Sequence, residues 1–240
     1  MNRIYFISIV CLGLLSCNTD NNLVIEESLD TLVRKHTIVM DNVIACASST
    51  TTENTIIAYV YPRPETTDIR YYETTDIAVD KSDYQQYQQV LLEPEDVFNG
   101  YLKKMTRITP EEKWVIITFF ENDTLHLSNP IRLKHLTKPT EFADTVTIDD
   151  TVAAHPVFSW QDGVYEDSTI YFQVVSDTDN SLLSGTYTIE KTFQYYVTDN
   201  VVLNITDNTP PDLTSSTPYT FTLMGVSEDN WVNLFTEKKI

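Results

Sequence analysis

Apolar and polar residues alternate with a period of two along much of this 240-residue chain, and this pattern favours β-strands. The alternation is clear in residues 219–223, 170–174 and 131–135, whereas helical periodicity is almost absent. Residues 114–120 are apolar at nearly every position, which is typical of a central strand with both faces buried. The sequence therefore predicts an all-β protein.

Clusters of Asn, Asp, Pro and Ser separate the expected strands about every ten residues, a spacing that is typical of β-sandwiches. A break is expected near residues 136–141, where Pro139 interrupts any strand ladder. We predict two tandem β-sandwich domains, over residues 31–138 and 143–240. The expected strands lie near residues 36–47, 55–62, 69–74, 99–107, 114–120 and 125–135, and then near 144–149, 156–160, 169–175, 186–197, 201–206, 219–226 and 230–236.

The N-terminus has the features of an export signal. Arg3 precedes an apolar run over residues 4–15 that is too short for a permanent membrane span. The run ends in Leu-Leu-Ser-Cys17, which resembles the lipobox of bacterial lipoproteins. The resemblance implies that residues 1–16 are a cleaved signal peptide and that Cys17 carries lipid on its sulfur and amine. The alternative is an ordinary cleaved signal peptide followed by an incidental thiol.

Lipidation would hold the protein stably on a membrane of the cell envelope. Asn18 follows the cysteine in place of Asp, which by the sorting rule of enteric Gram-negative bacteria favours the outer membrane. The sequence leaves open whether the protein faces the periplasm or the cell surface. Residues 17–30 are expected to form the lipidated cysteine and a flexible tether.

The charge of the chain excludes one class of partner. Removal of residues 1–16 takes away Arg3 and no acid, which leaves 15 Lys and Arg against 35 Asp and Glu, or a net charge of −20. Such a field repels phosphate backbones, so we expect no nucleic-acid binding. Cys46 would be the single thiol left in the lipidated chain, and its apolar neighbours predict that it is buried and inert.

The second domain resembles a fibronectin type III module. Leu213, Thr217 and Tyr219 reproduce the spacing of that family's tyrosine corner, in which the Tyr hydroxyl hydrogen-bonds back to the preceding turn. Residues 156–160 are similar to the family's strand B with its core Trp, and residues 170–174 suit its strand C. The resemblance implies a type III-like β-sandwich, a fold that is shared by many functions.

The first domain follows the same template more loosely. Ile108 and Trp114 have the spacing of the corner, with an indole N–H in place of the hydroxyl, and residues 125–133 are similar to the family's last loop and strand. Residues 92–98 fit the same spacing, although Phe98 could not make the bond. By this analogy the indole N–H of Trp114 should form a hydrogen bond within the turn that precedes it.

The acidic loops suggest one cofactor, calcium. Two predicted loops place oxygen ligands close together, but calcium needs six to eight oxygens, so folding would have to supply the rest. Acidic turn residues without any metal are the alternative reading. The candidate calcium ligands are Asp177, Asp179, Glu228 and Asp229.

No phosphate-binding loop, nucleophile elbow or Cys/His pairing is present in the sequence, so the prediction is a non-catalytic binding or adhesion-type lipoprotein. Its partner would be a protein or a glycan. A carbohydrate-binding role would need coplanar exposed aromatic side chains, whereas a structural subunit of an envelope complex would need a large apolar patch. An enzyme is the third class. The aromatic candidates are Tyr59, Tyr61, Tyr71, Tyr72, Tyr195 and Tyr196.

Overall fold

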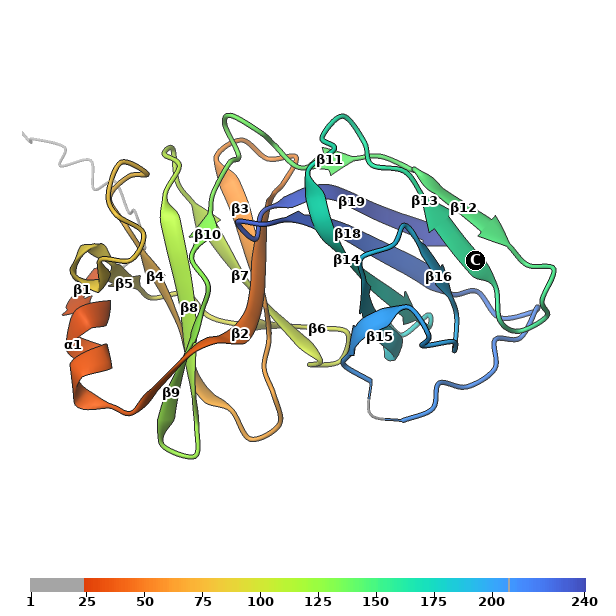
Figure 1. The fold of residues 1–240 in the computed structure, drawn as a ribbon, viewed down its shortest axis with the longest axis horizontal. Helices are drawn as coiled ribbons and strands as arrows, with labels where there is room; N and C mark the ends of the chain where they lie inside the picture. The colour runs from red at the N-terminus through yellow and green to blue at the C-terminus, as the bar shows by residue number, and fades with distance from the viewer. Residues whose placement is uncertain (1–23, 207) are drawn as a thin grey trace, which may run out of the picture.

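The computed structural model describes residues 24–206 and 208–240, without the side chains of residues 24–27 and 41–43, and the fold is all-β, as predicted (Figure 1). The expected signal peptide and Cys17 lie outside the described residues. Residues 24–30 of the expected tether form a strand and the start of a helix. None of the described helices has the length and apolar character needed to cross a membrane.

The first sandwich is one sheet of ten strands that folds back on itself at β2. The first half of β2 pairs in parallel with β9, and its second half pairs antiparallel with β3. The sheet order is β1-β5-β4-β8-β9-β2-β3-β7-β6, with β10 beside β8. The bounds are β1 Val24–Ser28, β2 Ile38–Ser49, β3 Thr55–Tyr61, β4 Thr67–Glu73, β5 Gln88–Val90, β6 Glu95–Val97, β7 Leu102–Ile108, β8 Trp114–Glu121, β9 Thr124–Ser128 and β10 Ile131–Arg132.

A short helix covers the outer face of this sheet and explains why β8 is apolar on both faces. Helix α1 (Leu29–Lys35) begins at Ser28, whose hydroxyl accepts a hydrogen bond from the amide of Thr31 at 3.4 Å. Leu29 packs on the outer face of the sheet with Ile116 of β8. The neighbouring residues Val115 and Ile117 of β8 point into the sandwich core. A single-turn 3₁₀ helix, η1 (Tyr84–Gln86), lies beside α1.

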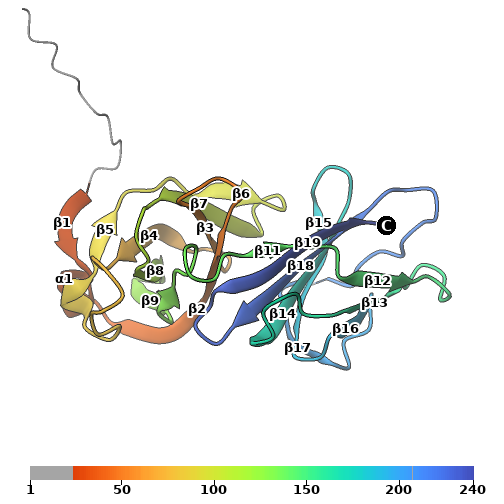
Figure 2. The ribbon, with the colours of Figure 1, turned by 90° about the horizontal axis from the view of Figure 1, so that it is seen from above.

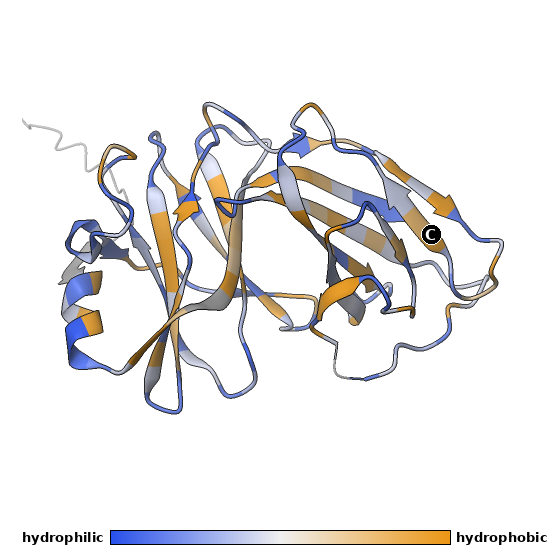
Figure 3. Ribbon diagram, in the orientation of Figure 1, coloured by the Kyte–Doolittle hydropathy of each residue, from blue (hydrophilic) through white to orange (hydrophobic). Residues whose placement is uncertain are grey.

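The second sandwich consists of two sheets that pack face to face, an immunoglobulin-like arrangement. The smaller sheet has the order β12-β13-β16, and the larger has the order β11-β19-β18-β14-β15-β17. Figure 3 shows the apolar residues concentrated on the strands of both sandwiches. The bounds are β11 Glu141–Phe142, β12 Val146–Asp149, β13 Val157–Trp160, β14 Ser168–Ser176, β15 Leu182–Thr188, β16 Thr192–Gln194, β17 Val201–Asn204, β18 Thr220–Ser227 and β19 Val232–Lys239.

The predicted tyrosine corner is present in the second sandwich. The hydroxyl of Tyr219 accepts a hydrogen bond from the amide of Thr214 at 3.2 Å, and Leu213 is buried beside it. Trp160, at the end of β13, is buried against Tyr171 with ring centroids 5.4 Å apart. These contacts fix the two sheets over one aromatic core.

The corner expected in the first sandwich is absent from its described residues, so that analogy was wrong. Ile108 is 65% exposed, whereas a corner residue must be buried. The indole N–H of Trp114 donates to the carbonyl of Ile77 at 3.3 Å, outside the expected corner. Spacing alone was misleading here because a hydrophobe six residues before an aromatic is common in an alternating sequence.

Two predicted strands are each divided in the structure. Residues 125–135 separate into β9 and β10 because Asn129 and Pro130 leave the ladder between them. Residues 186–197 separate into β15 and β16, which belong to different sheets. The chain changes sheets at residues 189–191, so its alternation continues although its partners change.

An apolar layer joins the two sandwiches and is called the seam below. It forms where β2, β3 and the β6–β7 region face the outer side of β14, β15, β18 and β19. Strand β14 is therefore buried on both faces: Tyr171 points into its own sandwich and Phe172 into the seam. The buried members of the seam are Phe98, Leu102, Phe172, Val174, Leu182, Ile205, Met224, Val226 and Val232.

The β18–β19 hairpin crosses the seam and enters the first sandwich (Figure 2). Trp231 is fully buried in the core of the first sandwich, and its indole N–H donates to the carbonyl of Lys138 at 2.8 Å. The carbonyl of Asn230 accepts a hydrogen bond from the backbone amide of Ala47 in β2 at 3.0 Å. The carbonyl of Asp229 accepts one from the backbone amide of Arg132 in β10, also at 3.0 Å. The hairpin is thus part of both sandwiches.

The connection between the sandwiches, residues 133–140, is fixed at several points. The carboxylate of Glu112 accepts from the amides of Leu136 at 3.1 Å and Thr137 at 2.7 Å. Thr140 and Ser49 exchange hydrogen bonds between their amides and hydroxyls at 2.8 and 2.9 Å. Because the connection and the hairpin both bind the first sandwich, the two sandwiches form one body.

Replacement of Trp231 by Ala should lower the free energy of unfolding by about 3–5 kcal/mol, because it empties a fully buried site in the core of the first sandwich. Urea unfolding of the two chains measures the change. Leu136→Ala is the control, since Leu136 is 54% exposed and its loss should change the free energy by less than about 0.5 kcal/mol. A loss below about 1 kcal/mol in the Trp231 variant would contradict the structural role of the hairpin.

A buried carboxylate connects three segments of the first sandwich. Glu73 of β4 accepts two hydrogen bonds from Arg107 of β7, at 2.9 and 3.0 Å, and one from Lys113 at 2.8 Å. Burial by itself would raise the pKa of Glu73, but the bonds from Arg107 and Lys113 outweigh it and hold the pKa below its ordinary value.

The lowered pKa predicts how this contact depends on pH. Its stabilisation is present above the unfolded-state pKa of about 4.3 and is lost as the pH falls through the lower folded-state pKa. Glu73→Gln should cost about 2–4 kcal/mol at pH 7, because it removes the negative charge that pairs with the partly buried cations Arg107 and Lys113. Urea unfolding at pH 7 and pH 3 should show the difference from wild type shrinking in acid. A difference that grows in acid would rule out this assignment.

Candidate functional site

A pocket lies within the seam, between strands of the two sandwiches. Its volume is about 220 Å³, and residues from β2, β3 and β7 form one wall while residues from β14, β15, β17 and β18 form the other. The pocket reaches the surface beside Asn129 and Asn230, which also line the neighbouring groove. The lining residues are Ile44, Ala45, Cys46, Tyr59, Val60, Tyr61, Leu102, Asn129, Ile170, Phe172, Tyr187, Leu203, Met224, Val226 and Asn230.

The polar groups of this pocket are neutral. Cys46 keeps some accessible surface, yet protein surrounds its sulfur closely enough that burial raises the pKa of the thiol to about 12. Burial likewise raises the pKa of Tyr59 to about 12 and that of Tyr187 well above its ordinary value. At neutral pH these groups are uncharged, so the pocket can bind an apolar molecule and form hydrogen bonds between neutral groups.

A second, larger hollow lies at the surface between the sandwiches and is called the groove. Its volume is about 850 Å³. Loops of the first sandwich line one side, and the start of β14 together with the β18–β19 turn lines the other. The lining residues are Lys81, Trp114, Asn129, Pro130, Lys134, Glu166, Asp167, Ser168, Thr169, Ser227, Glu228, Asp229 and Asn230.

Ion pairs account for some of the charge in the groove. Lys134 pairs with Asp229 at 2.6 Å, and Lys138 pairs with Asp167. Glu166 and Glu228 are exposed and have no ion pair within the described part of the chain. The ammonium of Lys81 lies 5.4 Å from the ring centre of Trp114. The groove therefore offers two open carboxylates beside one partly exposed indole.

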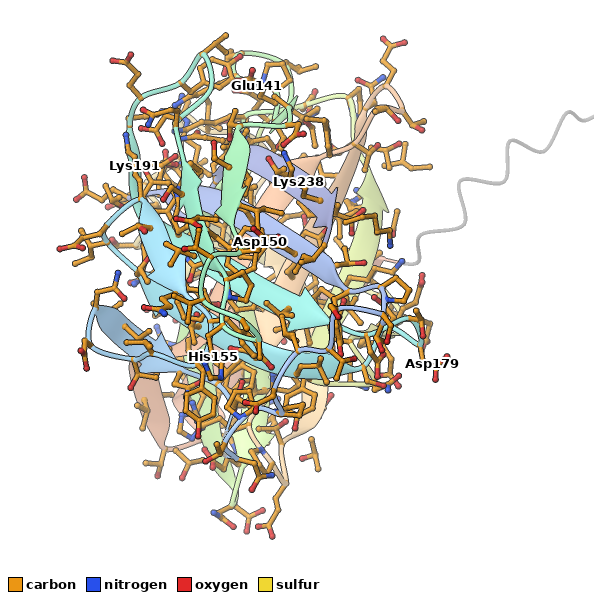
Figure 4. All side chains as sticks on the ribbon, turned by 90° about the vertical axis from the view of Figure 1, so that its right-hand side faces the viewer. Glu141, Asp150, His155, Asp179, Lys191 and Lys238 are labelled. Atoms are coloured by element: carbon orange, nitrogen blue, oxygen red, sulfur yellow. The ribbon has the colours of Figure 1, made fainter. Side chains whose placement is uncertain are left out.

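The structure does not bring the four candidate calcium ligands together. Asp177 and Asp179 lie in the β14–β15 turn, and Glu228 and Asp229 lie in the β18–β19 turn. Because Ser176 pairs with Thr220 and Ser168 with Ser227, the two turns are at opposite ends of β14. Figure 4 shows Asp179 at the edge of the molecule.

Each acidic loop also has local partners. The carboxylate of Asp177 accepts from the amides of Asp179 at 2.9 Å and Ser181 at 2.8 Å, as a turn-forming Asp does. Asp229 binds Lys134 and Ser227. Among the described residues no group of three or more His, Cys, Asp and Glu side chains is placed to hold a metal ion.

The tyrosines do not form the flat platform that a carbohydrate-binding sheet would need. Tyr71, Tyr72 and Tyr195 are buried in three different clusters. The two candidates in β3, Tyr59 and Tyr61, face the seam. Tyr196 is 43% exposed and stacks on His155 with ring centroids 5.0 Å apart. Both members of the adjacent pair Tyr71 and Tyr72 are buried, because Tyr72 packs in the cluster under α1 on the outer face of the sheet.

Sequence reasoning missed both the pocket and the groove, because their residues come from strands and loops that are distant in the chain. One signal was available: residues 170–174 and 219–226 have few charged residues on either face, so a second covered face could have been inferred. The partner of that face had no signature in the sequence.

No family model and no curated protein matches the chain. Among solved structures it is similar to the FN1–FN3 domains of chicken CNTN1, with 10% identity, a TM-score of 0.30 and coverage of 85% of this chain and 67% of that chain. It is also similar to a GH family 64 laminaripentaose-producing β-1,3-glucanase from Paenibacillus barengoltzii, with 12% identity and a TM-score of 0.30. That match covers 79% of this chain and half of the glucanase. At these scores the similarities carry no argument about function.

The raised pKa of Cys46 predicts slow thiol chemistry. A shift from an ordinary thiol pKa to about 12 lowers the thiolate fraction at pH 8 on the order of 10³-fold. Alkylation of Cys46 by N-ethylmaleimide at pH 8 should therefore be at least about 100-fold slower in the folded chain than in urea. Mass spectrometry of the Cys46 peptide gives both rates. Equal rates would show that the thiol is not enclosed by the seam.

Proposed function

We propose that this protein is a non-catalytic binding lipoprotein of the cell envelope, held on the outer membrane through lipid on Cys17, and that its macromolecular partner binds in the groove. The observation that carries this proposal is the groove's construction from loops of both sandwiches. Binding residues on loops are most effective when a rigid scaffold fixes them.

The rigidity of the groove supports this role. Trp231 and the connection of residues 133–140 fix the two sandwiches relative to each other, so the walls of the groove need not be ordered when a partner binds. Binding to a preorganised surface avoids the entropic cost of ordering it.

The charge of the groove favours a protein partner with basic side chains. Glu166 and Glu228 are exposed and open to such a partner, and the whole chain carries an excess of acids. Opposite charge across an interface accelerates association and determines which partners are accepted.

The test is capture of partners from native membranes with the full-length, lipidated, tagged protein in a mild detergent. We expect a partner near equimolar stoichiometry by mass spectrometry. The double variant Glu166→Lys/Glu228→Lys should reduce its capture at least tenfold. The matched control is Glu190→Lys/Asp199→Lys, which makes the same change in net charge at exposed positions outside the groove and should leave capture unchanged.

Equal loss in both double variants would mean that total charge, and not the groove, governs binding. Capture that neither variant affects would place the partner elsewhere on the protein. Hydrolysis of a substrate by the purified protein would overturn the non-catalytic role.

A glycan is the second candidate ligand, favoured by the indole of Trp114 beside the amides of Asn129 and Asn230. Sugars bind through stacking on aromatic rings together with hydrogen bonds to planar polar groups. A neutral glycan should lose affinity in Trp114→Leu and keep it in the charge-reversal variant. A basic protein partner should instead lose affinity in the charge-reversal variant Glu166→Lys/Glu228→Lys and keep it in Trp114→Leu.

A further inference from the structure

The pocket in the seam is built as a binding site of its own, separate from the groove. Protein interiors are normally filled to the density of organic crystals, and few voids exceed the size of a water molecule. This pocket of about 220 Å³ lies between two otherwise closely packed sheets. It exceeds an apolar cavity of about 150 Å³ that holds one benzene ring in another protein.

A small side chain lines the pocket on the side of the first sandwich. Cys46 of β2 packs in the seam with Phe172 and Met224 of the second sandwich, whereas its neighbour Ala45 packs toward the core of the first sandwich. Backbone pairing fixes these positions, because Ala45 pairs with Val60 and Cys46 with Tyr59. The empty space is therefore set by the ladder of β2 and β3 and not by a mobile loop.

The described residues of the lining are uncharged although the chain is strongly acidic. None of the described residues that line the pocket is Asp, Glu, Lys, Arg or His, whereas six of the thirteen residues that line the adjoining groove are charged. A charged ligand would lose its hydration in the pocket without gaining a counter-ion. The pocket therefore discriminates in favour of neutral molecules.

A hydrogen-bonding group faces this apolar space. Tyr187 lines the pocket and is partly buried, and its hydroxyl interacts electrostatically with Cys46 and Tyr61, two further residues of the lining. A tyrosine hydroxyl both donates and accepts, so it can bond to water or to a polar atom of a ligand. Its ring stacks on Phe172 with centroids 4.5 Å apart, which fixes its direction.

A route of entry is also present. Asn129 and Asn230 line both the pocket and the groove, and Leu203, a further lining residue, is 39% exposed. A small molecule can therefore reach the pocket from solvent without separation of the sandwiches.

We infer that the pocket binds a small uncharged molecule with an apolar, ring-sized body and one hydroxyl or carbonyl oxygen that bonds to the Tyr187 hydroxyl. The inference does not depend on the proposed partner of the groove, since it concerns a different cavity that shares only Asn129 and Asn230 with the groove.

The probe for the test is 2-naphthol, compared with its charged analogue 2-naphthoate. The full-length protein in lipid nanodiscs is alkylated with N-ethylmaleimide, and mass spectrometry follows modification of the Cys46 peptide. Because Cys46 lines the pocket, an occupant should shield its sulfur. We expect saturating 2-naphthol to slow alkylation at least fivefold and 2-naphthoate to leave the rate unchanged.

Tyr187→Phe removes the hydroxyl and keeps the ring, so the seam should remain packed. This variant should need about 3–10-fold more 2-naphthol for half protection, as expected for the loss of one neutral hydrogen bond. Tyr196→Phe is the matched control, because it removes a tyrosine hydroxyl outside the pocket, and it should behave as wild type.

Three results would overturn the inference. These are no protection by 2-naphthol at millimolar concentration, equal protection by 2-naphthoate, and an unchanged half-protection concentration in Tyr187→Phe. Capture of the groove's partner is measured separately, so either proposal can fail while the other stands.

Discussion

Insertion of the β18–β19 hairpin into the first sandwich is the contact on which the arrangement of the whole molecule depends. Trp231 belongs to the second sandwich by sequence but to the core of the first by burial. Burial of one large side chain contributes about 1.5–3 kcal/mol. The hydrogen bond from the indole N–H to the carbonyl of Lys138 also fixes the orientation of the ring. Tandem domains usually meet through smaller and more polar surfaces and move relative to each other. Here a hairpin shared by two cores prevents that movement.

The seam follows from the same contact. Once the hairpin is in place, the outer faces of β14 and β18 lie against β2 and β3, and their apolar side chains become a third core. The groove and the pocket are both consequences of this geometry, because each has one wall from each sandwich. Two sandwiches joined by a flexible linker would have neither cavity in a fixed form.

Part of the fold was predictable from local patterns. Alternation predicted the all-β class, and the spacing of Leu213 and Tyr219 predicted a corner that the structure contains. The same spacing failed for Ile108 and Trp114, since a corner requires burial of its first residue and Ile108 is exposed. The helix at residues 29–35 went unpredicted although Ser28 and the pair Leu29 and Leu32 are typical of a short capped helix. Seven residues are too few to give a clear period.

The candidate sites were much less predictable. The acidic turns of residues 177–179 and 228–229 look alike in sequence, yet pairing of β14 with β18 puts them at opposite ends of a strand. The tyrosines that suggested a sugar platform are divided among separate cores. Both results depend on strand order and register, which a period of two leaves open.

The sequence by itself determined the class of fold, the acidic character and the positions of most strands, because these depend on each residue and its near neighbours. Tertiary structure alone decided that two sandwiches share a core, that both faces of β14 are buried, and that a neutral pocket lies beside a charged groove. The physical reason is that an apolar side chain gains free energy from any apolar surface that excludes water. Which surface covers it is set by contacts between segments far apart in the chain.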